Sequence, residues 1–85
     1  SKNADETFRK WGREEVLRDV VWNIRRFRPD VIINRFSGTP QDGHGHHQAS
    51  ALLSKEAFTA AADPKRFPEQ LQWVEPWQPK RLVWN

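Results

Sequence analysis

All three histidines of the 85-residue chain lie within four residues, in the segment DGHGHH at 42–47. Neutral imidazole is a common zinc ligand and also titrates near neutral pH, so it serves both metal binding and proton transfer. His44 and His47 are three residues apart, and one helical turn would bring them together. Glycines on both sides of His44 let the backbone approach a metal or a substrate closely. The segment predicts a metal or catalytic site; the alternative is a set of polar loop histidines that only begin a helix.

Five further polar residues surround this pair and are candidates for the same site. A carboxylate two residues before His44 can orient an imidazole that binds a metal, or it can simply shape a turn beside glycine. Three of the others follow the apolar run at 31–33, where they contact a substrate or are solvated residues at the end of a strand. The five candidates are Asp42, His46, Asn34, Arg35 and Ser37.

The pattern of apolar residues predicts the order helix, strand, helix, strand. Helical spacing of aliphatic residues indicates a first helix over 7–28, and Pro29 ends it. A β-branched run indicates a strand over 30–36, a second helix is expected over 47–62, and a second strand over 80–84. The first helix has an apolar stripe made of Val16, Val20, Ile24 and Phe27, widened by Leu17 and Val21, and a polar face made of Glu14, Glu15, Arg18, Asp19, Arg25 and Arg26.

Two strands joined by a helix form a right-handed crossover in a parallel sheet, and ligands of such sheets bind beyond the carboxyl ends of the strands. The apolar run at 31–33 does not alternate, which favours a parallel strand covered on both faces. Two helices cannot cover both faces, and one histidine cluster cannot supply the three or so protein ligands of a catalytic zinc. We therefore expect an α/β fold in which the chain is a helix-strand-helix-strand fragment of a larger domain.

Five tryptophans and five phenylalanines are a large aromatic share for so short a chain. The stretch 65–79 contains Trp73 and Trp77 in a proline-rich connection, which is unusually long unless it is functional or packed on a neighbour. Large rings more often anchor a core or an interface than stack on a sugar. Exposed aromatic side chains would also allow the chain to form an oligomer.

Composition excludes several classes of protein. The chain has no cysteine, so it has no disulfide and no thiolate zinc site. No apolar run reaches the roughly 20 residues of a membrane span, and these 85 residues contain no signal peptide. The absence of cysteine fits either redox setting, so the compartment stays open between bacterial cytoplasm and export. The net charge is +3, but the arginines alternate with acids and no nucleic-acid-binding motif is present.

Two segments resemble a known family. The segments RPDVIINRFS at 28–37 and DGHGHHQAS at 42–50 are similar to the second half of the PIG-L / LmbE-like deacetylases. The flanking sequence resembles a bacterial branch of that family, so the likeness covers nearly the whole chain. It implies a Rossmann-like parallel sheet, a zinc cofactor and removal of the acetyl group from N-acetylglucosamine units of glycolipids or small glycosides.

The resemblance also implies roles for individual histidines. By position, His47 matches the zinc ligand, and His44 matches the histidine that stabilises the oxyanion or protonates the leaving amine. His46 stands where many members have aspartate, so the choice of ligand between His46 and His47 stays open. Asn34, Arg35 and Ser37 are then candidates for contacts with sugar hydroxyls.

One family motif is missing. The sequence Ala-His-Pro-Asp-Asp-Glu, which supplies two metal ligands and the general base, does not occur in this chain. We therefore expect residues 1–85 to be the C-terminal part of a deacetylase domain that is inactive without its N-terminal half. The alternatives are a non-enzymatic interaction module with a histidine-containing loop and a basic nucleic-acid-binding domain.

Overall fold

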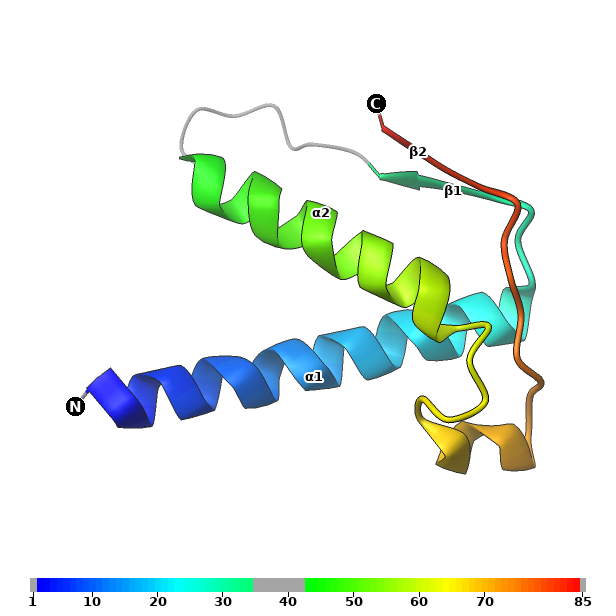
Figure 1. The fold of residues 1–85 in the computed structure, drawn as a ribbon, viewed down its shortest axis with the longest axis horizontal. Coiled ribbons are helices and arrows are strands. Elements are labelled where there is room, and N and C mark those ends of the chain that lie inside the picture. The colour runs from blue at the N-terminus through cyan, green and yellow to red at the C-terminus, as the bar shows by residue number, and fades with distance from the viewer. Residues whose placement is uncertain (1, 35–42, 85) are drawn as a thin grey trace.

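A computed structural model describes residues 2–34 and 43–84, with side chains described for 12–34 and 51–84. The expected order of helix, strand, helix and strand is confirmed (Figure 1). A short 3-10 helix, η2, lies in the connection before the last strand. The elements are α1 (Lys2–Phe27), β1 (Val31–Asn34), α2 (Gly43–Ala60), η2 (Pro68–Gln72) and β2 (Arg81–Trp84).

The two strands pair in parallel, as the crossover pattern predicted. The register runs from Val31 opposite Arg81 to Asn34 opposite Trp84. The carbonyl of Asp30 accepts hydrogen bonds from the backbone N–H groups of Lys80 and Arg81, at 2.8 and 3.1 Å. These bonds hold the entry points of both strands together, so their carboxyl ends leave the sheet on the same side.

The core forms between α1 and the C-terminal half of α2. α1 contributes three aliphatic residues at positions i, i+4 and i+7, and α2 meets them with alanines, whose small side chains let the helices approach closely. Val20, Ile32, Leu53 and Trp77 pack around this core. The buried apolar residues are Leu17, Val21, Ile24, Ala57, Ala60, Ala61 and Phe67.

The buried face of α1 is rotated from the one predicted. Val16 and Phe27 were expected in the core but are 48% and 70% exposed. The stripe that packs on the alanines of α2 begins at Leu17, one residue later in the chain. This rotation brings Arg25, four residues after Val21, to the same buried face as the core.

Arg25 was predicted on the solvent face, and that prediction is wrong. Its side chain is 1% exposed and donates six hydrogen bonds of 2.8–3.1 Å. Five acceptors are backbone carbonyls between Ala60 and Phe67, and the sixth is Oε1 of Gln70. The charge is tolerated inside the protein because all three guanidinium nitrogens donate hydrogen bonds, to carbonyls at the end of α2 and in the loop that follows it and to the side chain of Gln70 in η2. We call this set of acceptors the Arg25 cage.

The long connection between α2 and β2 packs on the rest of the chain, as one alternative for it proposed. Indole Nε1 of Trp77 donates to the carbonyl of Pro29 at 2.7 Å, and the guanidinium of Arg28 lies 5.1 Å from the centre of the Trp77 ring. Trp73, in contrast, is 71% exposed. One of the two tryptophans therefore anchors the turn that precedes β1, and the other leaves its ring at the surface.

The described elements cover the sheet on one face only. α1 and α2 lie on the same side of the two strands (Figure 1), and Ile32 of β1 packs toward their core. On the opposite face Val31 and Ile33 are 45% and 55% exposed. The expected cover on both faces of the strand is therefore absent among the residues that the structure describes.

Candidate functional site

The candidate site is built where β1 ends and α2 begins. The carboxyl ends of both strands and the first turn of α2 point to the same side of the molecule (left in Figure 1). In parallel α/β sheets this is the edge at which ligands bind. The N-terminal turn of a helix also presents free backbone N–H groups and a partial positive charge.

The histidine segment falls at this edge. α2 begins at Gly43, four residues before the start that the sequence suggested, so His44, His46 and His47 all belong to the helical backbone. Positions 44 and 47 are therefore separated by one turn of a continuous helix, as the spacing predicted, and position 46 falls on another face. Side chains of α2 are described from Ala51 onward.

Several predicted site residues stay predictions. Asp42, Arg35 and Ser37 lie outside the described residues, and the roles assigned to the three histidines are untested. Among the side chains that the structure does describe, no group of three or more His, Asp or Glu residues could hold a metal ion.

Asn34 is the one candidate whose side chain is described. It is the last residue of β1, it is partly buried, and it pairs with Trp84 in the sheet. Its side-chain nitrogen Nδ2 is shielded from solvent and has no hydrogen-bond partner among the described residues. A buried N–H donor without an acceptor is costly, and such donors are uncommon in proteins unless a ligand, an ion or water completes them. The amide thus offers a free donor at the carboxyl end of the sheet.

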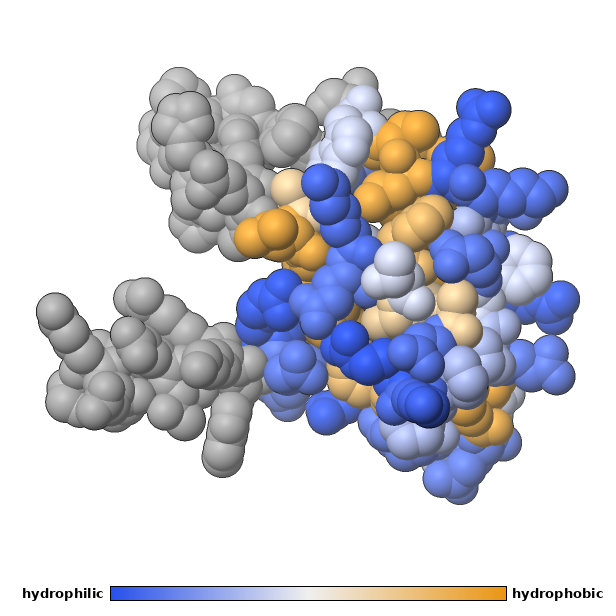
Figure 2. All heavy atoms as spheres, viewed as in Figure 1, coloured by the Kyte–Doolittle hydropathy of each residue, from blue (hydrophilic) through white to orange (hydrophobic). Residues whose placement is uncertain are grey.

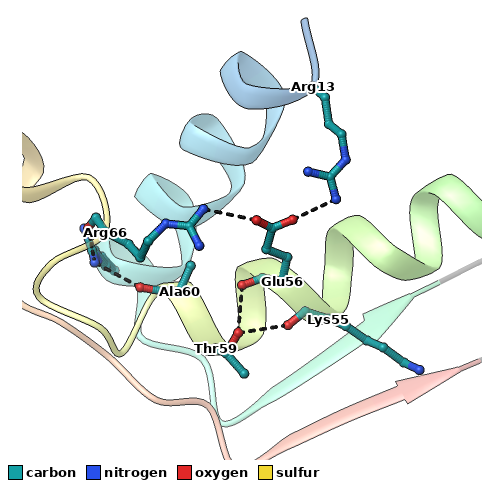
Figure 3. Close-up of polar contacts among 7 residues, drawn as sticks. Arg13, Lys55, Glu56, Thr59, Ala60 and Arg66 are labelled. Atoms are coloured by element: carbon teal, nitrogen blue, oxygen red, sulfur yellow. Dashed lines mark hydrogen bonds and ion pairs between the residues drawn. The ribbon is translucent and has the colours of Figure 1, made fainter. Parts of the chain in front are cut away.

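Glu56 holds the C-terminal half of α2 against α1. Its carboxylate accepts from Arg13 of α1 at 2.7 Å and from Arg66 at 3.1 Å (Figure 3). The hydrogen bond from Arg13 is the main cause that lowers the pKa of Glu56; burial opposes it and Arg66 adds to it. The residue therefore stays ionised and joins three segments of the chain, which fixes the direction in which α2 points toward the site.

The Arg25 cage holds the other end of α2. The guanidinium donates to the carbonyls of Ala60 and Ala61 at the end of α2, which also accept from the backbone N–H groups of Asp63 and Trp77. Its positive charge complements the negative end of the helix dipole. Burial lowers the pKa of Arg25, while Glu69 and Asp63 raise it by Coulomb attraction. Arg25 of α1 binds the C-terminal end of α2, the end opposite the histidine segment, and so helps to set where α2 ends.

Sequence reasoning missed Arg25, although a signal existed. Arg25 is four residues after Val21 and eight after Leu17, so it continues the buried stripe of α1. Charge normally argues for solvent, and the carbonyls that receive it come from residues 35 to 42 positions later in the chain. The loop that assembles them cannot be read from periodicity.

The comparisons with known proteins give one relative of the chain. It is 33% identical over 84 residues to a protein of Saccharopolyspora erythraea named 1D-myo-inositol 2-acetamido-2-deoxy-alpha-D-glucopyranoside deacetylase 2. The alignment covers 99% of this chain and 29% of the relative. No family model matches the chain. The chain therefore spans less than a third of a protein that it resembles along almost its whole length.

The relative agrees with the reaction class that the sequence suggested, because its name is that of a deacetylase. The fold agrees with the α/β class expected from the sequence, as a small mixed unit with two helices and a two-stranded parallel sheet. No helix among the described residues is long and apolar enough to cross a membrane. The finer statements about metal, substrate and residue roles belong to the proposal that follows.

Proposed function

We propose that the chain is the C-terminal part of a metal-dependent deacetylase that removes the acetyl group from an N-acetylglucosamine-type sugar conjugate. The observation that carries the proposal is the 33% identity with a named deacetylase across 99% of the chain. That relative is named for an acetamido-deoxy-glucopyranoside linked to myo-inositol, which suggests a sugar of the same chemical class as substrate. The remaining two thirds of such a protein would complete the domain.

The position of the histidine segment supports the proposal. It occupies the first turn of a crossover helix beyond the carboxyl end of a parallel strand, which is the usual ligand edge of an α/β sheet. A sequence whose histidines only began a helix would place them here as well. The agreement with a deacetylase along the whole chain favours the catalytic interpretation.

The donor set of this chain fits part of a zinc site. One imidazole of the histidine segment can serve as a ligand, and a catalytic zinc has about three protein ligands. His47 would hold the metal, with His46 as the alternative, and the other ligands would come from the rest of the longer protein. When bound, zinc lowers the pKa of a water molecule to about 7 and polarises a carbonyl.

The other residues of the chain would act on the substrate itself. His44 as imidazolium would donate a hydrogen bond to the carbonyl oxygen as negative charge develops on it. The same residue could then give its proton to the sugar nitrogen as the C–N bond breaks, so that the amine leaves neutral. Asp42 would orient an imidazole, and Asn34 would donate from Nδ2 to a sugar oxygen, with Arg35 and Ser37 nearby in sequence.

The proposal is tested in the longer polypeptide that contains this chain. Release of acetate from an N-acetylglucosaminyl inositol is measured together with metal content, for wild type and single alanine variants of His44, His46 and His47. We expect His47→Ala to lose both metal and activity, and His44→Ala to lose at least about 100-fold in rate while keeping the metal. The exposed Gln72→Ala is the control and should change neither quantity.

Two outcomes would overturn parts of the proposal. Full metal content in both His46→Ala and His47→Ala would remove the ligand assignment. No acetate release from any N-acetylated sugar by the metal-loaded wild-type polypeptide would remove the deacetylase function. The isolated 85-residue chain is expected to be inactive, and turnover by it alone would show that no other segment is required.

A further inference from the structure

The carboxyl ends of the two strands bring an amide and an indole side by side. Asn34 ends β1, Trp84 ends β2, and the two residues are register partners. Paired residues of a parallel sheet project to the same side, and Ile32, two residues before Asn34, packs toward the core. Both side chains therefore lie on the helix-covered face of the sheet, at the edge where α2 begins (Figure 1).

Each of the two side chains has a group available to a ligand. Trp84 is 41% exposed. Nδ2 of Asn34 has no hydrogen-bond partner among the described residues, and the residue is only partly buried, so rotation about its terminal torsion can turn the amide toward a ligand. Apolar surface gathers over the two strands (Figure 2). An aromatic ring, apolar surroundings and a few polar groups are the usual lining of a small-molecule site.

The position of Trp84 distinguishes it from the two tryptophans of the connection that precedes β2. Trp77 is an anchor, because its indole N–H donates to the carbonyl of Pro29. Trp73 is exposed, but it follows η2 and so lies outside the sheet. Trp84 combines an exposed ring with a place at the edge where parallel sheets bind ligands.

An indole beside an amide is chemically suited to a pyranose. One face of a pyranose ring consists mainly of C–H groups, whose slight positive charge is attracted to the negative face of an aromatic ring. The hydroxyl oxygens and the ring oxygen lie around the rim, where an amide N–H can donate to them. The two side chains together therefore suit the flat face and the rim of one sugar ring.

We propose that Trp84 is the platform on which the sugar ring of the substrate stacks, and that the amide of Asn34 donates to an oxygen at the rim of that ring. The inference rests on the proposed function, since the sugar is the substrate class suggested by the name of the relative. Trp84 holds the ring, while the histidine segment at the same edge carries out the reaction. Trp84 thus contributes to binding of the substrate and does not change the rate at which the bound substrate reacts.

Steady-state kinetics of the longer polypeptide test this role. Trp84→Leu keeps an apolar side chain but removes the aromatic face, so KM for the acetylated sugar should rise about 10-fold while kcat stays within about 2-fold of wild type. Trp84→Phe keeps an aromatic face and should retain most of the affinity. Trp73→Leu is the matched control and should change neither constant. An unchanged KM in Trp84→Leu, or an equal rise in Trp84→Leu and Trp84→Phe, would overturn the proposal.

A binding measurement on the unsubstituted polypeptide complements the kinetics, because it depends neither on turnover nor on the folding of Trp84→Leu. The longer polypeptide is labelled with fluorotryptophan and titrated with methyl glucosaminide, the amine form of the sugar, which is not consumed. The fluorine NMR signal of Trp84 is the one that is missing in Trp84→Phe. It should shift with the sugar and stay constant with sorbitol, an open-chain polyol that has no flat face. The signal of Trp73 should stay constant with both.

The outcomes separate this inference from the proposed function. A shift at Trp84 in a polypeptide that releases no acetate would keep the sugar subsite and reject the deacetylase function. Acetate release by a polypeptide whose Trp84 signal does not respond to the sugar would keep the function and reject the stacking platform. A Trp84 signal that shifts equally with sorbitol would also reject the platform, since the face of the ring would then not be recognised.

Discussion

The guanidinium of Arg25 lies 3.1 Å from the side-chain oxygen of Gln70, and Gln70 uses its own amide nitrogen to reach the carbonyl of Arg18 at 2.9 Å. Both side chains are buried. α1 therefore contacts η2 twice through a single glutamine, once by a side chain and once by its backbone. This link places the connection 61–80 on α1 and so fixes the point from which β2 enters the sheet.

Replacement of Arg25 by lysine should destabilise the chain strongly. An ammonium group has three donors and cannot reach six acceptors spread over the chain, so several charge-assisted hydrogen bonds of the Arg25 cage would be lost while the positive charge stays buried. We expect a loss of about 3–5 kcal/mol in the free energy of unfolding. The measurement is the urea midpoint of the 85-residue chain.

The control for this change is its neighbour. Arg26 is exposed, so Arg26→Lys should lie within about 0.5 kcal/mol of wild type. Similar midpoints for Arg25→Lys and Arg26→Lys would mean that the cage contributes little to stability. A large loss in both variants would point to the end of α1 as a whole, and the specific role of Arg25 would be withdrawn.

Glu56 should make stability depend on acid. Its pKa in the folded chain is lowered, chiefly by the hydrogen bond from Arg13, so ionised Glu56 stabilises the folded state at pH values above its ordinary value of 4.5. That stability falls as the pH drops below 4.5 and the carboxylate takes up a proton. Because the side chain is 29% exposed, we expect Glu56→Gln to cost only about 1 kcal/mol at pH 7.

The measurement is the difference in urea midpoint between wild type and Glu56→Gln at pH 7 and at pH 3. The difference should shrink at pH 3, since the unfolded chain binds a proton at this position below its ordinary value of 4.5 and the ionised folded form then loses its advantage. Glu75→Gln, a change at an exposed position, serves as control and should show a small difference at both values. A difference for Glu56→Gln that is as large at pH 3 as at pH 7 would speak against the ion pairs.

The elements of the fold were readable from the sequence because they depend on local pattern. A β-branched run between Pro29 and a glycine-containing loop predicts β1, and helical spacing predicts α1. The parallel pairing also followed, since a helix between two strands needs a crossover. The start of α2 at Gly43 was harder to see, because two glycines in its first turn lower helix propensity and argue for a loop.

What the sequence could not supply was the partner of each side chain. Val16 and Leu17 are adjacent aliphatics, and only the alanine face of α2 decides that Leu17 is the buried one. Arg25 has the same chemistry as Arg26, yet one is buried and the other exposed. For the candidate site the sequence provided the residue types and their place after β1, while the metal and the substrate contacts remain predictions.

Trp77 and Trp73 should respond differently to the same substitution. Trp77→Phe removes the indole N–H that donates to the carbonyl of Pro29, and it reduces the aromatic surface beneath Arg28. We expect a loss of about 1–3 kcal/mol in the free energy of unfolding. Trp73→Phe is the matched control because its ring is largely exposed, and it should change stability by less than about 0.5 kcal/mol.

Thermal unfolding followed by circular dichroism measures both variants under one condition. The midpoint should fall by several degrees for Trp77→Phe and remain within error for Trp73→Phe. If Trp73→Phe were the more damaging of the two, the connection would pack through the other ring. The proposed anchor at Pro29 would then be wrong.

Asn34→Leu should uncouple stability from substrate binding. The change removes a donor, Nδ2, that is buried without a partner among the described residues, and an apolar group of similar size avoids that cost. The 85-residue chain should therefore be as stable as wild type or up to about 1 kcal/mol more stable. In the longer polypeptide the same variant should raise KM for the acetylated sugar about 10-fold with little change in kcat, because a binding contact would be lost.

The two measurements separate a ligand donor from a structural one. A loss of more than about 1 kcal/mol in the 85-residue chain would mean that Nδ2 has a partner within the chain, since only a satisfied donor is costly to remove. An unchanged KM would show that the substrate does not use it. Asn34→Asp is the complementary variant, because it keeps nearly the same shape but exchanges the donor for an acceptor. KM should rise at least as much as in Asn34→Leu. Stability should fall, because a carboxylate at this half-buried position is poorly solvated.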